Sequence, residues 1–337
     1  MKCLTCKGDC ILSPEKVLDE IFGKYMACSA CPPDPGYNKS GPLTEKLNST
    51  SGKCKKCGRR HLDLVIGNVL TILKEEGIFP EDASLKDVGT PLIAFGFTLP
   101  YPPRLDTKSL VLIMDSVTRD IAREILGQVP EVKGVVKRTG SQSQSIGILD
   151  TTSIPHTYEL LAGCDMRCDI ISSSFGELCV YKNQSKIHIE FNNTKIAKME
   201  ELFFRGELEN SIIVDGLCGP GTLGMLCILA GAQKVIFNDA WLPALENTIL
   251  NLKANSNLLG IEMDFENKEN RKLIADEPVL MATAKGSAHV MVFHGDIRKL
   301  DRVVKKSDIC LIDAFPAVDP QRFKAACKDF SKKTVII

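Results

Sequence analysis

A glycine-rich run, Val214-Asp-Gly-Leu-Cys-Gly-Pro-Gly221, separates a short apolar segment from an apolar helical segment. Glycines in such a loop remove side chains where the backbone must pass close to a ligand, and the start of a helix offers free amide groups. The spacing Gly219-x-Gly221-x-x-Gly224 also fits the fingerprint of dinucleotide-binding enzymes. The loop therefore predicts a nucleoside-binding site and does not by itself identify the ligand.

Acidic or amide residues end four successive β-rich runs of the C-terminal third: Asp215; Asn238 and Asp239; Asp296; and Asp313. Pro316 follows Asp313 at the end of the fourth run. Ligands bind at the carboxyl ends of strands in open α/β sheets, so we expect these side chains at one edge of a sheet. Asp239, at an exposed tip, can accept both hydroxyls of a ribose. The carboxylate of Asp296, or the amides beside it, would lie near an adenine amino group. An acid four residues before Gly219 is typical of S-adenosylmethionine enzymes and is not required by NAD fingerprints.

Each of these acids also has a simpler explanation, because a lone Asp at a strand end is more often a helix cap or a turn former. The four tips in order favour a nucleoside site over a Rossmann domain that has lost its cofactor. An NAD dehydrogenase is disfavoured, since no hydride-handling pair of His and Arg is apparent. Four cysteines in core-like positions are expected to be buried thiols and not nucleophiles: Cys218, Cys227, Cys310 and Cys327.

Cysteines gather near the N-terminus, where three C-x2-C pairs fall within the first 57 residues. Two such pairs complete one tetrahedral zinc site, and metal binding supplies folding energy to a segment with little apolar core. With one more cysteine and a histidine, the candidates match the ligand demand of two closed zinc sites: Cys3, Cys6, Cys10, Cys28, Cys31, Cys54, Cys57 and His61. One zinc with spare thiols, or an iron–sulfur cluster on the first three cysteines, are the alternatives. The spacing does not tell which pairs meet.

Basic residues surround the last cysteine pair: Lys53, Lys55, Lys56, Arg59 and Arg60. They could hold phosphates of a nucleic acid, or they could form a solvated rim without a ligand. The chain has 42 basic and 42 acidic residues, so any nucleic acid must be bound by a local patch. Its apolar runs are too short to span a membrane and its N-terminus lacks a secretion segment, which predicts a cytoplasmic protein.

The 337 residues are expected to form three parts: a cysteine-rich zinc module over 1–62, a small α+β domain over 63–205 and a Rossmann-like domain over 206–337. Caps and apolar periodicity predict helices from Pro14, over 61–76 and over 118–126. Strands are predicted over 110–114, 134–137, 177–181 and 186–191.

From 211 onward, short β-rich runs alternate with helical stretches, which indicates βαβ units and a mainly parallel sheet in an α/β fold. The final run, over 334–337, is expected to be the fifth strand of that sheet. The last two strands of a methyltransferase domain would then be absent, and a second copy of the chain is expected to cover the open edge as a homodimer.

The chain resembles the archaeal and eukaryotic tRNA (guanine-N1)-methyltransferase family over about residues 110–316. The resemblance rests on four segments in order: Lys133-Gly-Val-Val-Lys-Arg138, His156-Thr-Tyr-Glu-Leu-Leu-Ala-Gly163, Lys186 to Phe191, and Asp215 to Gly221. Aminocarboxypropyltransferases of the wybutosine pathway share this layout. The resemblance implies an S-adenosylmethionine pocket and an acceptor site, lined respectively by Asp215, Gly219, Gly221, Asp239 and Asp296, and by Asp313 and Pro316.

Two segments depart from the family pattern. Asp313-Ala-Phe-Pro316 stands where the family has an Asn-Leu-Pro-like segment, and Asn192-Asn193-Thr194 stands where it has Asn-Pro-Arg. The catalytic carboxylate of the family has no clear counterpart, although Glu200 and Glu201 lie nearby. The position that the family methylates therefore does not transfer to this chain.

Together these features predict a zinc-bearing, S-adenosylmethionine-dependent methyltransferase in which Asp313 accepts a proton or hydrogen bond from the attacking atom. A tRNA base is the expected acceptor. A small molecule or cofactor precursor is the alternative acceptor. A non-catalytic RNA-binding protein that kept a methyltransferase fold is the alternative from another class.

Overall fold

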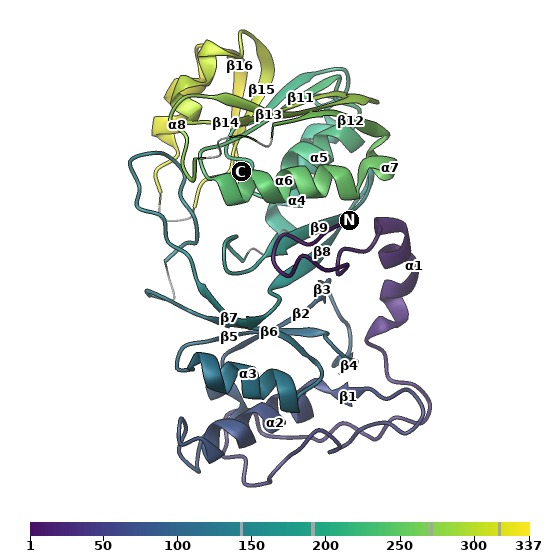
Figure 1. Ribbon diagram of the computed structural model, residues 1–337. Coiled ribbons are helices and arrows are strands. Elements are labelled where there is room, and N and C mark those ends of the chain that lie inside the picture. The colour runs from purple at the N-terminus through teal and green to yellow at the C-terminus, as the bar shows by residue number, and fades with distance from the viewer. Residues whose placement is uncertain (142–143, 190–192, 268, 270–271, 316–317) are drawn as a thin grey trace.

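A seven-stranded sheet forms the C-terminal part of the computed structural model, which describes residues 1–141, 144–189, 193–267, 269, 272–315 and 318–337 (Figure 1). Five neighbouring strands are parallel, in the order β14 (His289–His294), β11 (Lys234–Asp239), β10 (Ile212–Asp215), β15 (Ser307–Ile312) and β16 (Ser331–Ile336). Numbered along the chain, this order is 3-2-1-4-5, the arrangement of a Rossmann-like sheet whose order reverses at the first strand. The predicted α/β class and parallel sheet are confirmed.

Helices cover both faces of this sheet, as a parallel sheet requires. One face carries α4 (Asn193–Phe204), α5 (Thr222–Leu229), α6 (Leu242–Ala254) and α7 (Ser256–Leu259). The other carries η2 (Ile297–Arg302) and α8 (Gln321–Cys327). Gly224 lets α5 lie close to the sheet, because a Cβ at this position would meet the Phe237 ring at 2.2 Å.

An antiparallel hairpin extends the sheet beyond β14 and was not predicted. It consists of β12 (Ile261–Glu266) and β13 (Val279–Gly286), and β13 pairs with β14. The exposed face of the hairpin explains the weak sequence pattern, since Phe265 and Val279 are both 46% exposed and interrupt the alternation of apolar and polar residues.

The middle of the chain forms two smaller sheets. The first has the order β2 (Thr90–Ile93), β5 (Leu110–Met114), β6 (Val132–Lys137) and β7 (Glu159–Gly163). Two helices share a core with one face of this sheet: α2 (Leu62–Glu75) and α3 (Arg119–Gln128). The second sheet has the order β3 (Phe95–Gly96), β8 (Met166–Ser173) and β9 (Gly176–Asn183).

Shorter elements complete the N-terminal half. The helix predicted from Pro14 is α1 (Pro14–Lys24), and Ser13 caps it by accepting from the Lys16 amide. The helices predicted over 61–76 and 118–126 are α2 and α3. β1 (Arg60–His61) pairs with β4 (Arg104–Leu105), and η1 (Leu85–Val88) precedes β2.

Three asparagines join strand β9 to helix α6: Asn247 and Asn251 within the helix, and Asn255, which caps its C-terminus. Their side-chain oxygens accept from every second amide of β9, at 3.2, 2.7 and 3.0 Å from Asn183, Tyr181 and Cys179 respectively. The spacing of the asparagines along the helix matches the spacing of the amides along the strand, because four residues of a helix rise ~6 Å and two residues of a strand ~6.7 Å. The ladder fixes the middle of the chain against the C-terminal domain.

The strand predicted over 186–191 is wrong for its described part, and positions 190 and 191 lie outside the described residues. β9 ends at Asn183, whose carbonyl then accepts from the Lys186 and Ile187 amides in a turn. The three-part division of the chain stays a prediction. Within the described residues, no helix is long and apolar enough to cross a membrane.

Candidate functional site

A cleft lies at the carboxyl ends of β10, β11 and β15. Three segments bound it: the glycine turn that follows β10, the turn at 186–188 after β9, and residues 146–149 from the long connection between β6 and β7. The cleft therefore opens where the strand order of the parallel sheet reverses, which is the expected place for a ligand. Of the predicted residues, Gly219, Asp239 and Asp313 line it.

Asp239 supports the glycine turn from within the protein. Its Oδ2 accepts from the Gly219 amide at 3.0 Å and its Oδ1 from the Trp241 amide at 2.8 Å. The expected exposed tip is wrong, because Asp239 is only 5% exposed. Burial raises the pKa of this carboxyl to about 7, although the amide hydrogen bonds act in the opposite direction.

The glycines of the turn have backbone conformations that other residues rarely adopt. Gly219 has φ +52° and Gly221 has φ +85°. A Cβ built on Gly219 would meet no heavy atom within 4 Å, so this position faces open space in the cleft. Gly221 does not line the cleft and caps α5, and a Cβ there would meet Thr248 at 3.0 Å.

Asp215 lies beneath the turn and does not line the cleft. Its Oδ2 accepts from the Gly224 amide at 2.9 Å, in the first turn of α5. Burial raises the pKa of its carboxyl to about 7, and the nearby charges of Asp313 and Asp239 add to the effect. Asp215 is therefore placed to hold the start of α5 and to act on a ligand through the turn.

Asn238 and Asp296 are buried and lie outside the cleft lining. The Asn238 amide donates to the carbonyls of Gly216 and Gly295, which ties the ends of neighbouring strands together. Asp296 caps η2 and forms an ion pair with Arg298. Its Oδ2 also accepts from the Thr151 amide at 3.2 Å and from the Thr151 hydroxyl at 3.0 Å.

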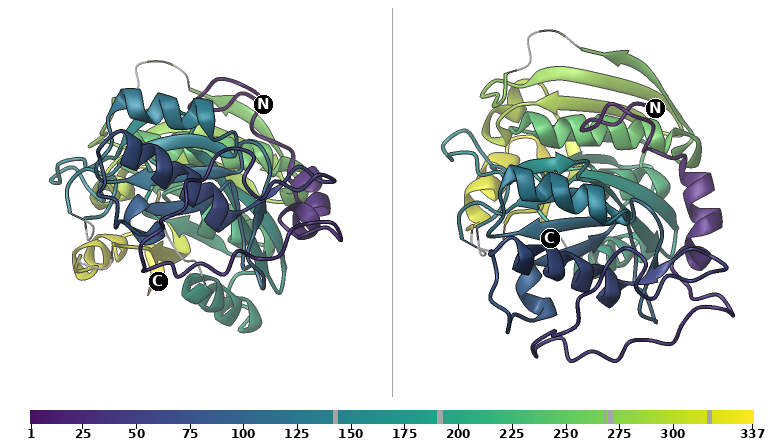
Figure 2. Two further views of the ribbon diagram at one scale, coloured as in Figure 1. Left: turned by 90° about the horizontal axis from the view of Figure 1, so that it is seen from below. Right: turned by 60° about the horizontal axis from the view of Figure 1, so that its bottom comes forward.

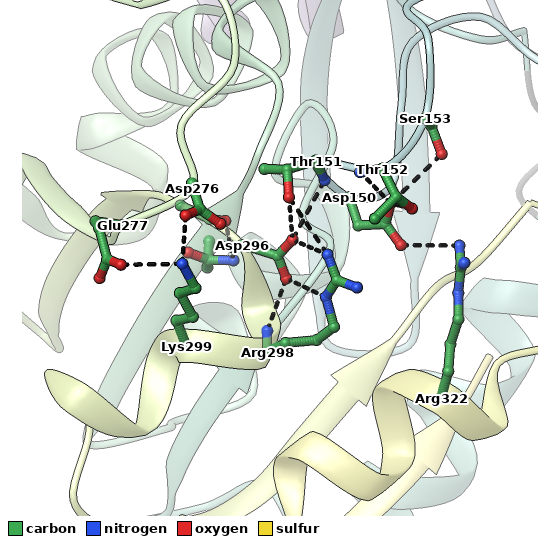
Figure 3. A network of polar contacts seen from close by, with 12 residues as sticks. Asp150, Thr151, Thr152, Ser153, Asp276, Glu277, Asp296, Arg298, Lys299 and Arg322 are labelled. Carbon is green, nitrogen blue, oxygen red and sulfur yellow. Dashed lines mark hydrogen bonds and ion pairs between the residues drawn. The ribbon is translucent and has the colours of Figure 1, made fainter.

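Residues 146–153, which we call the strap, cross from the middle of the chain to the C-terminal domain (Figure 3). Thr151 bonds to Asp296, and the fully buried Asp150 pairs with Arg322 of α8 at 3.0 Å. Ile148 packs beside Trp241, and Leu149 enters the core formed by η2 and α8. The strap therefore closes one side of the cleft, a role that its mixed sequence did not indicate.

The far side of the cleft carries a charged pair and an aromatic ring. Lys195 of α4 places its Nζ 2.5 Å from Asp313 Oδ2, and both residues line the cleft. The rings of His188 and Phe315 meet edge to face, with centroids 5.8 Å apart. Pro316 lies outside the described residues. Sequence reasoning missed Lys195, although a single lysine following Asn192-Asn193-Thr194 stands near the Arg of the family pattern.

The seven cysteines near the N-terminus form two groups of four together with Cys164. The first cysteine group is Cys3, Cys6, Cys10 and Cys164, and the second cysteine group is Cys28, Cys31, Cys54 and Cys57. His61 belongs to neither group, because it caps α2 by accepting from the Asp63 amide at 3.0 Å. The eighth candidate ligand is therefore Cys164, which sequence reasoning missed, and not His61. The four core-like cysteines at 218, 227, 310 and 327 are buried, as predicted.

The basic cluster is smaller than the sequence suggested. Arg60 is fully buried and pairs with Glu131 at 2.6 Å. Arg59 donates to the carbonyls of Gly23 and Met26. The exposed cations that remain are Lys53, Lys55 and Lys56.

No family model and no curated protein matches the chain. Solved structures do match, and one is a tRNA m1G37 methyltransferase from M. jannaschii, with 16% identity and a TM-score of 0.37. That match covers 66% of this chain and 54% of the other, so the chain spans about half the length of this relative.

Two further solved structures come from Pyrococcus horikoshii. TYW2 in complex with MeSAdo has 17% identity and a TM-score of 0.41, over 79% of this chain and 76% of the other. Trm1 with S-adenosyl-L-methionine has 18% identity and a TM-score of 0.35, over 48% and 40%. The Rossmann-like arrangement is evident from the strand order of the chain itself and does not depend on these similarities.

Proposed function

We propose that the chain is an S-adenosylmethionine-dependent transferase that moves a methyl group to an acceptor held beside Asp313. One observation carries this proposal: a single cleft holds Asp239 with the Gly219 turn on one side and the Lys195–Asp313 pair on the other. The two sides have different chemistry. We call them the donor side and the acceptor side.

The donor side fits a nucleoside. A carboxylate oxygen has two acceptor lone pairs, so Asp239 retains acceptor capacity for ribose hydroxyls after it accepts two backbone amides. Gly219 leaves open space above the turn, where backbone can approach a ligand. Trp241 adds an apolar edge to the cleft lining and is itself packed beside Ile148 and Ile187.

The acceptor side fits a group transfer that depends on position. When bound, S-adenosylmethionine supplies a methyl group that its sulfonium charge already activates. The protein then has to hold the attacking atom in line and take up its proton. We assign the uptake of that proton to Asp313, whose charge is balanced by Lys195. Phe315 presents an aromatic ring in the same part of the cleft.

A tRNA base is the acceptor that we propose first, on the resemblance of the sequence and with Lys53, Lys55 and Lys56 as phosphate contacts. A small molecule is the second candidate. The burial of Arg60 and the hydrogen bonds of Arg59 to two backbone carbonyls favour it, because they leave fewer cations of this cluster for a nucleic acid.

We also propose that the second cysteine group binds zinc. The Sγ atoms of Cys28 and Cys54, of Cys28 and Cys31, and of Cys31 and Cys57 are each 3.6 Å apart. Four thiolates about 2.3 Å from one tetrahedral ion would be separated by roughly 3.8 Å. The group therefore has the size of a single-ion site and holds together a segment with little apolar core.

The acceptor is tested with donor labelled in its methyl group. Wild-type protein is incubated with total tRNA and, separately, with a small-molecule extract of cells. A variant in which Lys53, Lys55 and Lys56 are changed to Gln is assayed beside it, and the same changes at Lys305, Lys306 and Lys328, also exposed, serve as the matched control.

If tRNA is the acceptor, label enters tRNA, and the first triple variant binds tRNA more weakly with a shallower salt dependence. Each lost phosphate contact lowers the log-log salt slope by ~0.7 to 0.9. Label that enters only the extract supports the small molecule instead. Label in neither fraction, despite binding of the donor, contradicts both acceptors and supports the non-catalytic alternative.

A further inference from the structure

The first cysteine group joins parts of the chain that are far apart in sequence. Cys3, Cys6 and Cys10 lie in the N-terminal segment, and Cys164 follows β7. In Figures 1 and 2 the N-terminal segment lies against the C-terminal domain, away from the rest of the cysteine-rich region. Cys3 packs with Met166, Tyr181 of β9 and Leu250 of α6. We propose that this group binds a second zinc ion, which anchors the N-terminal segment beside the cleft.

The separations of the sulfurs fit one tetrahedral ion. Sγ of Cys3 is 3.8 Å from Sγ of Cys164, Cys6 is 3.7 Å from Cys10, and Cys10 is 3.9 Å from Cys164. These values match the roughly 3.8 Å edge of a tetrahedron of thiolates around zinc. In an iron–sulfur cluster the four cysteines are divided among two or four irons, so the sulfurs on different irons lie farther apart than those around a single ion.

The backbone around Cys3 repeats the backbone around Cys54 of the second cysteine group. The Cys3 amide donates to the Gly8 carbonyl, and the Lys7 amide donates back to the Cys3 carbonyl. In the same way, the Cys54 amide donates to Arg59, and the Gly58 amide donates to Cys54. Both turns therefore wrap a C-x2-C pair with the same two hydrogen bonds.

The residue after each pair has the same backbone conformation. Gly58 has φ +72°, which glycine adopts freely, and Lys7 has φ +58°, which a lysine adopts only at a cost. Such a conformation persists where its surroundings determine it. A metal ion that holds Cys3 and Cys6 would supply that constraint, and this second observation is independent of the sulfur distances.

A short series of contacts leads from this group to the cleft. The Thr5 hydroxyl, between Cys3 and Cys6, donates to Asp165 Oδ1 at 2.7 Å. Oδ2 of the same Asp165 accepts from the Ser185 amide at 2.8 Å. Ser185 precedes Lys186, the first residue of the turn that bounds the cleft. The proposed ion is thus placed to fix the position of this wall.

The test is the zinc content of the full chain, measured by elemental analysis after dialysis against a weak chelator. Wild type is expected to hold two zinc ions. Cys6→Ser is the first variant, because Cys6 is exposed and its loss costs little packing. It should hold one ion, and so should Cys164→Ser. Cys164→His, which restores a ligand, should hold two.

Two variants serve as controls. Cys168→Ser changes another buried cysteine that packs beside Cys164 but lies outside the group, and it should keep both ions. His61→Ala should also keep both. Circular dichroism checks that each variant is folded. The proposal is wrong if Cys6→Ser and Cys164→Ser each hold two ions. It is also wrong if wild type holds a single ion that is lost only in Cys57→Ser. Neither result depends on the donor or the acceptor.

Discussion

The donor side and the acceptor side of the cleft differ in how their residues are assembled. On the donor side, Gly219 and Asp239 come from the ends of two adjacent parallel strands. On the acceptor side, Asp313 follows a third strand, whereas Lys195 comes from α4. The polar groups of the donor side therefore come from the ends of neighbouring strands, whereas the charged pair of the acceptor side also needs a helix that precedes the sheet in the chain.

The largest expected effect is that of Asp313→Asn on the acceptor side. An amide cannot take a proton from the attacking atom, so turnover should fall by ~10² to 10⁴ while the affinity for the donor stays unchanged. Turnover is measured as transfer of labelled methyl into the fraction that the wild type labels. Affinity for the donor is measured by calorimetry. Asp319→Asn, at a nearby exposed acid, is the matched control. Full turnover in Asp313→Asn would remove Asp313 from the chemistry.

On the donor side, Asp239→Asn should weaken binding of S-adenosylmethionine with little effect on turnover at saturation. Loss of charge-assisted hydrogen bonds costs ~1.5 to 3 kcal/mol, or roughly 10- to 150-fold in affinity. Because Asp239 also supports Gly219, urea unfolding checks that the variant remains folded. Glu262→Gln on the exposed hairpin is the control. Unchanged affinity would contradict the ribose assignment.

The pH dependence of donor binding sharpens the same assignment. Burial raises the pKa of Asp239 to about 7, and ribose hydroxyls and a sulfonium both favour the ionised carboxylate. Affinity should therefore rise by about tenfold between pH 6 and pH 8 and then level off. Titrations at constant ionic strength measure this slope. If the affinity of Asp239→Asn still rises with pH, the pH dependence belongs to another group, such as Asp215.

The smallest effect is expected for the strap. Thr151→Val removes the hydroxyl bond to Asp296 and keeps the shape of the side chain, at a cost of ~1 kcal/mol. If the strap holds the donor in the cleft, the donor should dissociate roughly fivefold faster, as stopped-flow fluorescence of Trp241 can record. Thr152→Val is the matched control, because the Thr152 hydroxyl bonds to Asp150 and does not reach the C-terminal domain. Equal rates in both variants would show that the strap does not retain the donor.

Residues whose position depends on their own strand could be predicted from sequence, whereas residues whose position depends on a contact distant in sequence could not. Strand periodicity and the glycine turn predicted the parallel sheet and placed Gly219, Asp239 and Asp313 at one cleft, because each position depends on its own strand. Asp296 was assigned to a ligand, and the structure shows its oxygens bonded to Thr151 and Arg298. The sequence around 151 carries no periodic pattern from which this contact could be inferred.

Long-range pairing also explains the errors in the cysteine region. The pairs within 28–57 are close in sequence, and they meet in the second cysteine group. Cys164 lies 154 residues from Cys10 and was not among the candidates, whereas His61 was included for its proximity to Cys57. Arg60 was likewise placed on a basic surface, although it is buried against Glu131. In each case a partner distant in sequence decides the environment of the residue.

Calorimetric titration of the wild-type chain with S-adenosylmethionine and, separately, with NAD⁺ tests the central claim most directly. Both ligands suit a glycine turn followed by an Asp at the second strand end. With Asp239 and the Gly219 turn in the cleft, and Asp215 beneath the turn, the account predicts one bound S-adenosylmethionine per chain and no heat from NAD⁺. Absence of binding by S-adenosylmethionine, or binding of NAD⁺ in its place, would contradict it.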